Sequence, residues 1–237
     1  LDWLTQVRVQ YPLALATLWT APSATWDQRR SVVACLEAPV VTLVRGGERA
    51  GKSRGLQHLT VAQALGGDHP AVRAWGEVNQ LPVDLIPPGP GRVYAVALTS
   101  TFSLRNHRPL FDTLIGRGKH WYNRNGKGEA WLQVEVPGYD APAEIWFKSL
   151  DQGADAFQGD SIRWAWLDEE PKGEQGRAVY GQVKARVMDQ DGRLGISMVP
   201  MSGLTWVFEE LVQQRRDGAV VVELDALDNP YLPAQRA

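Results

Sequence analysis

Short apolar runs, separated by polar or glycine-containing segments, dominate the pattern along this chain. The β-branched run at 40–44 is too short for a helix and matches a strand that is buried on both faces of a sheet. A second buried strand is predicted over 92–101. The same reasoning predicts further strands at 131–136, 145–148, 162–167, 194–199 and 220–224.

Helical patterns fall between several of these strands. One helix is predicted to start near Thr25, whose hydroxyl suits an N-cap, and a second ends at Leu65, before a Gly-Gly pair and a proline. A third is predicted over 206–215, and residues 1–25 are expected to form a peripheral helical lead-in. Strands that alternate with helices indicate an α/β fold with a mostly parallel central sheet flanked by helices, and 1–237 is expected to be a single domain.

Composition narrows the class of protein. Apolar residues make up 44% of the chain and charged residues 22%, as in ordinary soluble globular domains. No window approaches the roughly eighteen consecutive apolar residues of a membrane span. Cys35 is the only cysteine, so an intrachain disulfide is impossible, and its apolar neighbours indicate a buried thiol. The four histidines lack the spacing of a zinc site.

The charge balance limits how the chain can meet nucleic acid. A net charge of −2 is not that of a protein that coats DNA, so any DNA contact must be local, transient or shared among subunits. Two segments are predicted to be loops, namely 82–91, which is rich in proline and glycine, and 116–128, which is basic and glycine-rich.

A candidate phosphate-binding loop follows the first strand directly. The pattern G-x-x-x-x-G-K-[ST] is matched by Gly46, Gly51, Lys52 and Ser53. The glycines let backbone N–H groups approach phosphate oxygens, and the following helix adds the positive end of its dipole. Lys52 is expected to reach the β- and γ-phosphates, and the Ser53 hydroxyl to bind Mg²⁺. A strand before the loop and a helix after it turn the pattern into a prediction of nucleotide binding.

A second chemical element follows the predicted strand 162–167. Asp168 is expected to hold Mg²⁺ through water, and Glu169 is the candidate base that orients and deprotonates an attacking water. Glu170 is the alternative base. An Asp-Glu pair is typical of hydrolytic motors rather than of nucleotide kinases, whose attacking group is a substrate hydroxyl.

A longer ordered pattern leads up to these carboxylates. It reads IWFKSLDQG at 145–153, AFQG at 156–159 and WLDEEP at 166–171. This run resembles the ATPase domain of phage large terminases, which carries F-K-S, F-Q-G and W-L-D-E-E-P in the same order. The resemblance extends over most of the chain, ending with LDNPYLP at 227–233, and implies a P-loop NTPase of the ASCE type that hydrolyses ATP with Mg²⁺.

The resemblance also implies roles for individual residues. Gln28 lies where terminases carry a glutamine that recognises adenine, and Arg49 looks like the phosphate-sensing arginine of the family. Either Ser197 or Ser202 occupies the motif that couples hydrolysis to movement, because the spacing here departs from the family pattern S-T-P-x-G. The implied catalytic residues are Lys52, Arg49 and Glu169. The implied metal ligands are Ser53 and Asp168. The implied nucleotide-binding residues are Gln28, Gly46, Gly47, Glu48, Arg49, Ala50, Gly51, Lys52, Ser53 and Arg54.

Partners follow from the same resemblance. It implies a homo-oligomeric, pentameric ring that pumps double-stranded DNA through the portal protein of a procapsid, together with a small terminase subunit, in the cytoplasm of an infected bacterium. No membrane partner is implied. The family carries a nuclease domain after the ATPase, which this chain does not include, so ATP hydrolysis without DNA cleavage is expected.

Several assignments stay open at this point. A trans-acting arginine could be Arg117, Arg124 or Arg163. DNA phosphates could meet the basic stretches at 105–108 and 117–127, although these stretches equally suit a solvated loop or a subunit interface. Two other functions compete with packaging, namely a helicase or recombination-type ATPase and a nucleotide-gated binding module with negligible turnover.

Overall fold

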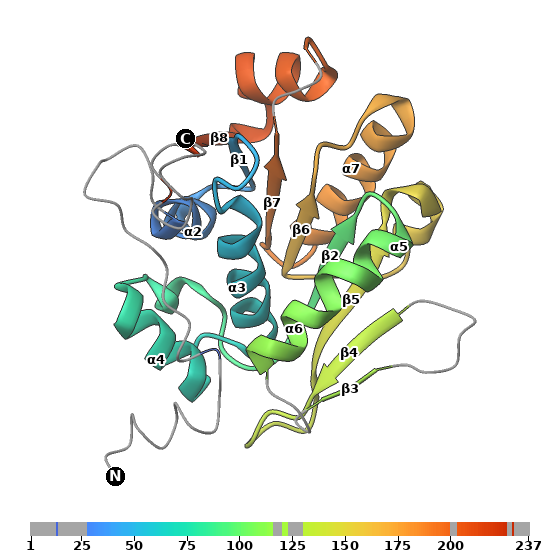
Figure 1. Cartoon of the computed structure of the whole chain (residues 1–237). Coiled ribbons are helices and arrows are strands. Elements are labelled where there is room, and N and C mark those ends of the chain that lie inside the picture. The colour runs from blue at the N-terminus through green and yellow to red at the C-terminus, as the bar shows by residue number, and fades with distance from the viewer. Residues whose placement is uncertain are drawn as a thin grey trace.

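The computed structural model describes residue 13 and residues 28–115, 120–122, 130–199, 203–226 and 229. A single eight-stranded sheet organises them, in the strand order β3-β4-β5-β2-β6-β7-β1-β8 (Figure 1). The strands are β1 (Val41–Gly46), β2 (Arg92–Ala97), β3 (His120–Tyr122), β4 (Ala130–Val134), β5 (Ala143–Ser149), β6 (Trp164–Asp168), β7 (Arg193–Met198) and β8 (Val220–Leu224). In this spatial order, each neighbouring pair from β5 through β2, β6, β7 and β1 to β8 is parallel. The pairs β3–β4 and β4–β5 are antiparallel. The predicted α/β class with a mostly parallel sheet is confirmed.

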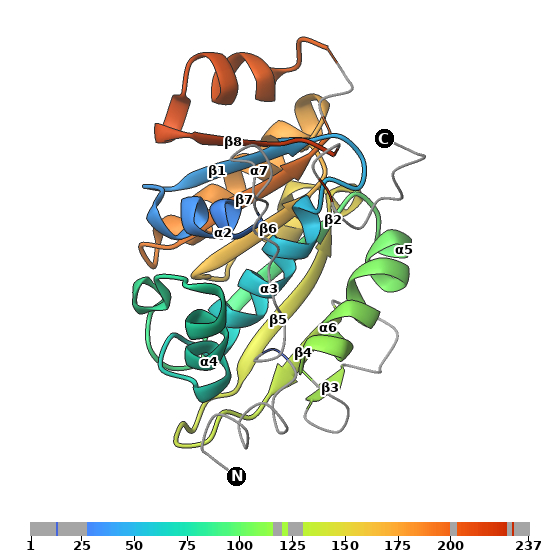
Figure 2. The ribbon, with the colours of Figure 1, turned by 60° about the vertical axis from the view of Figure 1, so that its left-hand side comes forward.

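Helices cover both faces of this sheet (Figure 2). One face carries α2 (Gln28–Glu37), α3 (Lys52–Leu65), α4 (Pro70–Asn79) and α6 (Arg108–Ile115). The other carries α7 (Gly173–Met188) and the π-helix η6 (Val207–Gln213).

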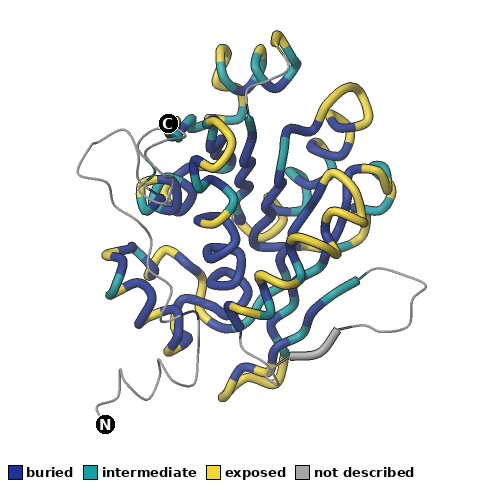
Figure 3. Tube along the Cα trace, viewed as in Figure 1, coloured by how far each residue is buried: buried dark blue, intermediate teal, exposed yellow. Residues whose placement is uncertain are grey.

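The strands are apolar on both sides because each face of the sheet packs against its own hydrophobic core. In β6, Trp164 and Trp166 belong to the core under α3, whereas the alternate residues Ala165 and Leu167 belong to the core under α7. Side chains in a strand alternate between faces, so a sheet covered on both sides needs continuously apolar strands. Figure 3 shows the result, with the central strands and α3 buried and α5 and α6 exposed along their outer side.

Some predicted boundaries were wrong. The strand expected over 92–101 ends at Ala97, and a helical segment follows that consists of α5 (Ser100–Phe102), the π-helix η3 (Ser103–His107) and then α6. Part of the expected loop 116–128 forms β3, and the rest of that loop lies outside the described residues. The loop 82–91 includes a short 3-10 helix, η2 (Val83–Leu85), and is anchored by the buried Val83 and Ile86.

Two further helices, α4 and α7, had not been predicted. Pro70 begins α4 instead of ending a helix, with His69 as the N-cap, because proline is well tolerated in the first turn, where its missing N–H has no partner. In α7 the glycines at 173, 176 and 181 weaken the helical pattern. The Cβ of any other residue at Gly176 would lie 2.4 Å from the backbone of Pro171, so the helix needs that glycine.

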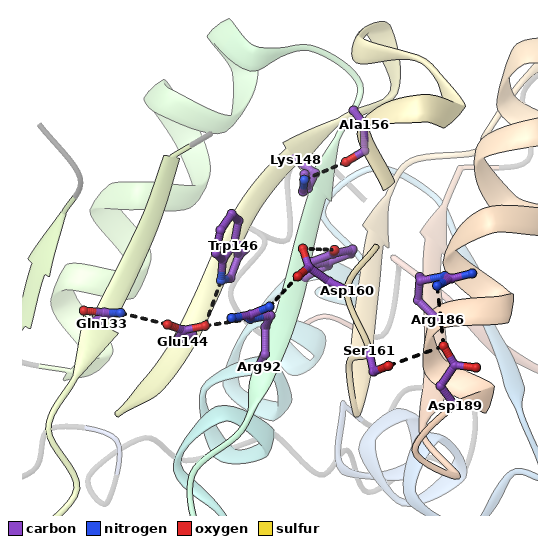
Figure 4. Close-up of polar contacts among 11 residues, drawn as sticks. Arg92, Gln133, Glu144, Trp146, Lys148, Ala156, Asp160, Ser161, Arg186 and Asp189 are labelled. Atoms are coloured by element: carbon purple, nitrogen blue, oxygen red, sulfur yellow. Dashed lines mark hydrogen bonds and ion pairs between the residues drawn. The ribbon is translucent and has the colours of Figure 1, made fainter. Parts of the chain in front are cut away.

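A polar ladder crosses three neighbouring strands (Figure 4). Gln133 of β4 donates to Glu144 of β5 over 2.7 Å, and Arg92 of β2 donates to the same carboxylate over 2.6 Å. Arg92 also forms an ion pair with Asp160, whose carboxylate accepts a hydrogen bond from the Tyr94 hydroxyl. These contacts join β4, β5 and β2 to the segment before β6.

Cys35 is buried in α2, and burial raises the pKa of its thiol to about 12. This confirms the prediction of a buried thiol. Among the described residues, no helix combines the length and the apolar character needed to cross a membrane.

Candidate active site

The candidate phosphate-binding loop lies between β1 and α3, the strand and helix that the sequence predicts on either side of it. Gly46 ends β1 and lies so close to β8 that a Cβ there would be 2.4 Å from the Leu224 carbonyl oxygen. Gly51 has a φ of 85°, in the left-handed region that glycine adopts at little cost, and it precedes Lys52, the first residue of α3. Two glycines are therefore required by the geometry of this loop.

The Lys52 side chain folds back over the loop. Its Nζ donates to the carbonyl oxygens of Gly46 and Gly47 over 3.0 and 2.7 Å. Burial lowers the pKa of this ammonium group, while the negative charges of Glu169, Asp168 and Glu48 oppose that shift. The side chain is buried, yet within the described part of the chain it forms no ion pair. A buried cation held only by neutral carbonyls is suited to receive an anion.

Asp168 brings the second chemical element to the same place. It is the last residue of β6, and its Oδ1 accepts a hydrogen bond of 2.8 Å from the Ser53 hydroxyl. β7 lies between β1 and β6 in the sheet, so this contact links the helix that follows β1 to the end of a strand that does not pair with β1. The sequence had placed these two residues in one site, and the structure confirms that they meet.

Glu169 adopts an unusual backbone conformation beside Asp168. Its φ is 88°, a region that costs a non-glycine residue about 1–3 kcal/mol, and its N–H donates to the Ser197 carbonyl oxygen over 2.8 Å. Burial, and then the neighbouring Asp168 charge, raise the pKa of the Glu169 carboxyl. A raised pKa brings a carboxylate closer to what a general base needs.

The alternative base, Glu170, is already engaged. Its carboxylate is buried and accepts a hydrogen bond from the Thr205 hydroxyl. It therefore ties the end of β6 to the segment before η6. The Glu169 carboxylate, the other candidate base, is held by the Val199 backbone N–H instead.

Ser197 also converges on Asp168. It stands opposite Asp168 in the β6–β7 pairing, and its hydroxyl donates to Asp168 Oδ1 over 2.8 Å while accepting from the Trp166 indole N–H over 2.9 Å. Ser202, the other candidate for the coupling role, lies outside the described residues.

His107 is a site residue that the sequence reasoning missed. It had been grouped with the basic residues 105–108 that could meet DNA, but its side chain is fully buried and its Nε2 lies 3.1 Å from Asp168 Oδ2. That grouping was wrong for His107. Ser103, His107 and Phe111 recur every four residues and are all buried, but two of them are polar, so no apolar pattern in the sequence marked this buried side.

Solved structures of similar fold are known. The large terminase of a thermophilic bacteriophage superposes with a TM-score of 0.59 at 15% identity, covering 90% of this chain and 48% of that protein. The complex of the same terminase with ADP gives 0.57 at 13% identity, covering 91% and 48%. The large terminase ATPase domain of Thermus phage P74-26 gives 0.54 at 12% identity, covering 92% of this chain and 96% of that domain.

This chain has the fold of phage large terminase ATPase domains. It spans about half the length of the thermophilic bacteriophage terminase and nearly all of the isolated P74-26 ATPase domain. No protein-family model matches the chain, and no curated protein matches it. At these identities the likeness establishes the fold alone.

Other residues implied by the terminase resemblance lie around the loop. Gln28 begins α2, is buried, and donates from Nε2 to the Gly51 carbonyl oxygen over 3.1 Å. Arg49 is exposed, has a φ of 62°, and accepts a hydrogen bond on its carbonyl oxygen from Asn229. The remaining loop residues comprise the exposed Gly47, Glu48 and Arg54 and the buried Ala50.

Arg163 is not available to a neighbouring subunit in this terminase ATPase fold. Its guanidinium is buried and donates to the carbonyl oxygens of Pro87 and Gly89 over 3.0 and 2.8 Å. It also precedes β6, whereas the site lies at the other end of that strand. Arg163 as a trans-acting arginine is therefore wrong. Arg117 and Arg124 lie outside the described residues.

Lys148, from the F-K-S part of the terminase pattern, is an anchor. Its buried Nζ donates to the Ala156 carbonyl oxygen over 2.6 Å (Figure 4). The same Nζ lies over the rings of Tyr94, Trp146 and Phe157. Burial lowers the pKa of this ammonium to about 8. The order F-K-S then F-Q-G thus reflects a packing contact between β5 and the segment before β6.

The residues present fit a magnesium-bound polyphosphate. The described chain holds no cluster of three or more His, Cys, Asp or Glu side chains that could bind a metal by themselves. Mg²⁺, however, is commonly held by one or two protein oxygens together with substrate phosphates. The Ser53 hydroxyl and the Asp168 carboxylate are such oxygens, and Lys52 supplies the charge for the phosphates.

Proposed function

We propose that this chain is the ATP-hydrolysing motor domain of a phage large terminase, which moves double-stranded DNA into a procapsid. The observation that carries the proposal is the 2.8 Å contact between Ser53 of the P-loop and Asp168 at the tip of β6. It is supported by a fold shared with terminase ATPase domains, one of which was solved with ADP.

Each residue of the site has a role in this reaction. Lys52 and the loop N–H groups bind the phosphates, and Lys52 exchanges its carbonyl partners for phosphate oxygens. Ser53 and Asp168 would hold Mg²⁺, which would supply positive charge for the β- and γ-phosphates. Glu169 orients a water molecule and takes its proton as the water attacks the γ-phosphorus; ADP then leaves with the β–γ bridging oxygen.

Residues beside the reacting groups complete the proposal. Gln28 contacts the adenine, and Arg49 senses the γ-phosphate from its exposed position in the loop. Ser197, through its hydrogen bond to Asp168, transmits a movement of that carboxylate to β7. In this proposal movement starts at Ser197, because it is the hydroxyl that touches both the metal-binding carboxylate and the indole of Trp166.

The partners belong to the same proposal. The motor assembles as a homo-oligomeric ring on the portal protein of a procapsid, receives DNA with a small terminase subunit, and works in the cytoplasm of an infected bacterium. We propose that the exposed Arg105 contacts DNA phosphates, together with the basic residues of 117–127. Charge reversal at Arg105 should then flatten the salt dependence of DNA binding.

A phosphate-release assay tests the chemistry. Lys52→Ala is expected to abolish nucleotide binding. Glu169→Gln is expected to retain binding but to lower turnover roughly 10²- to 10⁴-fold, because a positioned base is lost while the phosphate contacts remain. Glu174→Gln is the matched control, since Glu174 is an exposed carboxylate in the first turn of α7.

Three outcomes would count against the proposal. Unchanged turnover in Glu169→Gln would remove the water-activating role. Negligible turnover in the unmodified protein, with nucleotide binding retained, would favour a nucleotide-gated module. ATP-driven strand unwinding would favour the helicase or recombination-type ATPase.

A further inference from the structure

His107 connects a separate helical segment to the carboxylate at the centre of the site. The segment 100–115 follows β2, and from it the His107 imidazole reaches Asp168 Oδ2 at 3.1 Å. The imidazole is completely buried. Its ring centroid lies 4.6 Å from that of Trp166, and Phe102 meets it edge-on at 5.8 Å. Packing against the rings of Trp166 and Phe102 fixes the direction in which the His107 imidazole points.

The two oxygens of Asp168 therefore have different partners. Oδ1 accepts hydrogen bonds from the hydroxyls of Ser53 and Ser197, both over 2.8 Å. Oδ2 is instead the oxygen that His107 contacts. A carboxylate that binds Mg²⁺ is ionised and can only accept, so the proposed metal site requires His107 Nε2 to be the donor in this contact. Rotation of the carboxylate would break this contact, which means that His107 holds Oδ1 toward Ser53.

A break in regular helix geometry puts His107 in reach. Residues 103–107 form a π-helical turn, in which the Arg108 N–H donates to the Ser103 carbonyl oxygen five residues back. Such turns are rare and occur frequently at functional sites. The inner side of the segment is buried at Ser103, His107 and Phe111, while Leu104 and Leu110 are exposed on its outer side.

We propose that His107 is a positioning residue, which sets the affinity of the Ser53–Asp168 pair for Mg²⁺ and makes that affinity depend on the segment 100–115. This inference rests on the proposed function, because it requires a metal at that pair. Groups that orient a metal ligand from behind are typically worth about 10- to 100-fold in metal affinity or activity. Loss of the His107 contact should therefore weaken Mg²⁺ binding by this factor while leaving the phosphate-binding loop intact.

The test measures binding rather than turnover. A fluorescent ADP is titrated into the protein, first in EDTA and then at increasing Mg²⁺ concentration. In His107→Leu the affinity in EDTA should equal that of the unmodified protein, but the Mg²⁺ concentration that gives the half-maximal metal effect should rise about 10- to 100-fold. His107→Gln, whose amide can donate from the position of Nε2, should restore most of the loss, and the shorter His107→Asn should not.

His58→Leu is the matched control, because His58 is also a buried imidazole packed near a tryptophan, Trp75, but is not in contact with Asp168. It should leave the Mg²⁺ midpoint unchanged. An unchanged midpoint in His107→Leu would overturn the proposal, as would equal losses in EDTA and in Mg²⁺, which indicate a damaged loop. If circular dichroism shows that His107→Leu is unfolded, equal midpoints for the Gln and Asn variants overturn it. Failure of the unmodified protein to bind nucleotide at all would instead refute the proposed function.

Discussion

Replacing Ser197 by alanine would remove one oxygen that has two buried partners. The hydroxyl donates to Asp168 Oδ1 and accepts from the Trp166 indole, and the side chain is 1% exposed. Water cannot readily take its place in so closed a position. The substitution therefore costs one charge-assisted hydrogen bond and also leaves an indole N–H without an acceptor.

The expected magnitude follows from these two losses. A hydrogen bond to a charged group contributes about 1.5–3 kcal/mol, and an unpaired buried donor costs about 1–3 kcal/mol. Both depend on the same oxygen, so they are not fully additive, and the free energy of unfolding should fall by about 2–4 kcal/mol. Most of the effect should be present without nucleotide, because both contacts exist in the protein alone.

Urea denaturation followed by far-UV circular dichroism measures this loss. The midpoint should fall while the slope stays constant. Ser161→Ala is the control, since that exposed hydroxyl meets Asp189 only at 3.4 Å (Figure 4) and its loss should stay within about 0.5 kcal/mol. In a Trp166→Phe background the cost of Ser197→Ala should shrink, because the indole donor is gone. Equal midpoints for the two serine variants would show that the buried hydroxyl does not stabilise the fold in this way.

Two further predictions concern stability. Burial lowers the pKa of both His58 and His69 from 6.5 to about 4. Below pH 6.5 the unfolded chain therefore binds protons that the folded chain does not. As a result, the free energy of unfolding should fall as the pH drops from 6.5 to about 4. Urea midpoints across this range check it, and a flat profile, or one that His69→Asn does not flatten in part, would contradict it. Arg163→Ala should lower the free energy of unfolding by about 1–3 kcal/mol, because the Gly89 carbonyl loses its side-chain donor and the Pro87 carbonyl keeps only the Gly67 N–H, while phosphate release per folded molecule stays unchanged. Loss of turnover that Glu169→Gln subunits rescue on mixing would restore the trans-arginine hypothesis.

Local spacing explains what the sequence could predict. The loop residues Gly46 to Ser53 are contiguous, and Asp168 follows an apolar strand, so both elements could be found without knowing the fold. Parallel strands end at one edge of a sheet, which is why these two elements were expected to meet. The strands were predicted well because a sheet covered on both faces requires uninterrupted apolar runs.

Contacts between distant segments explain what the sequence could not predict. His107 meets Asp168 across 61 residues through a π-helical turn, and no local pattern specifies that turn. Arg163 is near Asp168 in sequence, but a strand rises roughly 3.3 Å per residue, so five residues separate them by roughly 16 Å. Proximity along a strand therefore points to the opposite end of the sheet, away from the site.

A structure of the protein with Mg²⁺ and a non-hydrolysable ATP analogue would show whether the P-loop and the tip of β6 hold one metal-bound nucleotide. We expect a metal about 2.1 Å from Ser53 Oγ, with Asp168 beside it directly or through one water, and Lys52 Nζ moved from the Gly46 and Gly47 carbonyls onto phosphate oxygens. A nucleotide bound elsewhere on the fold, or a metal that meets neither Ser53 nor Asp168, would contradict the proposed site.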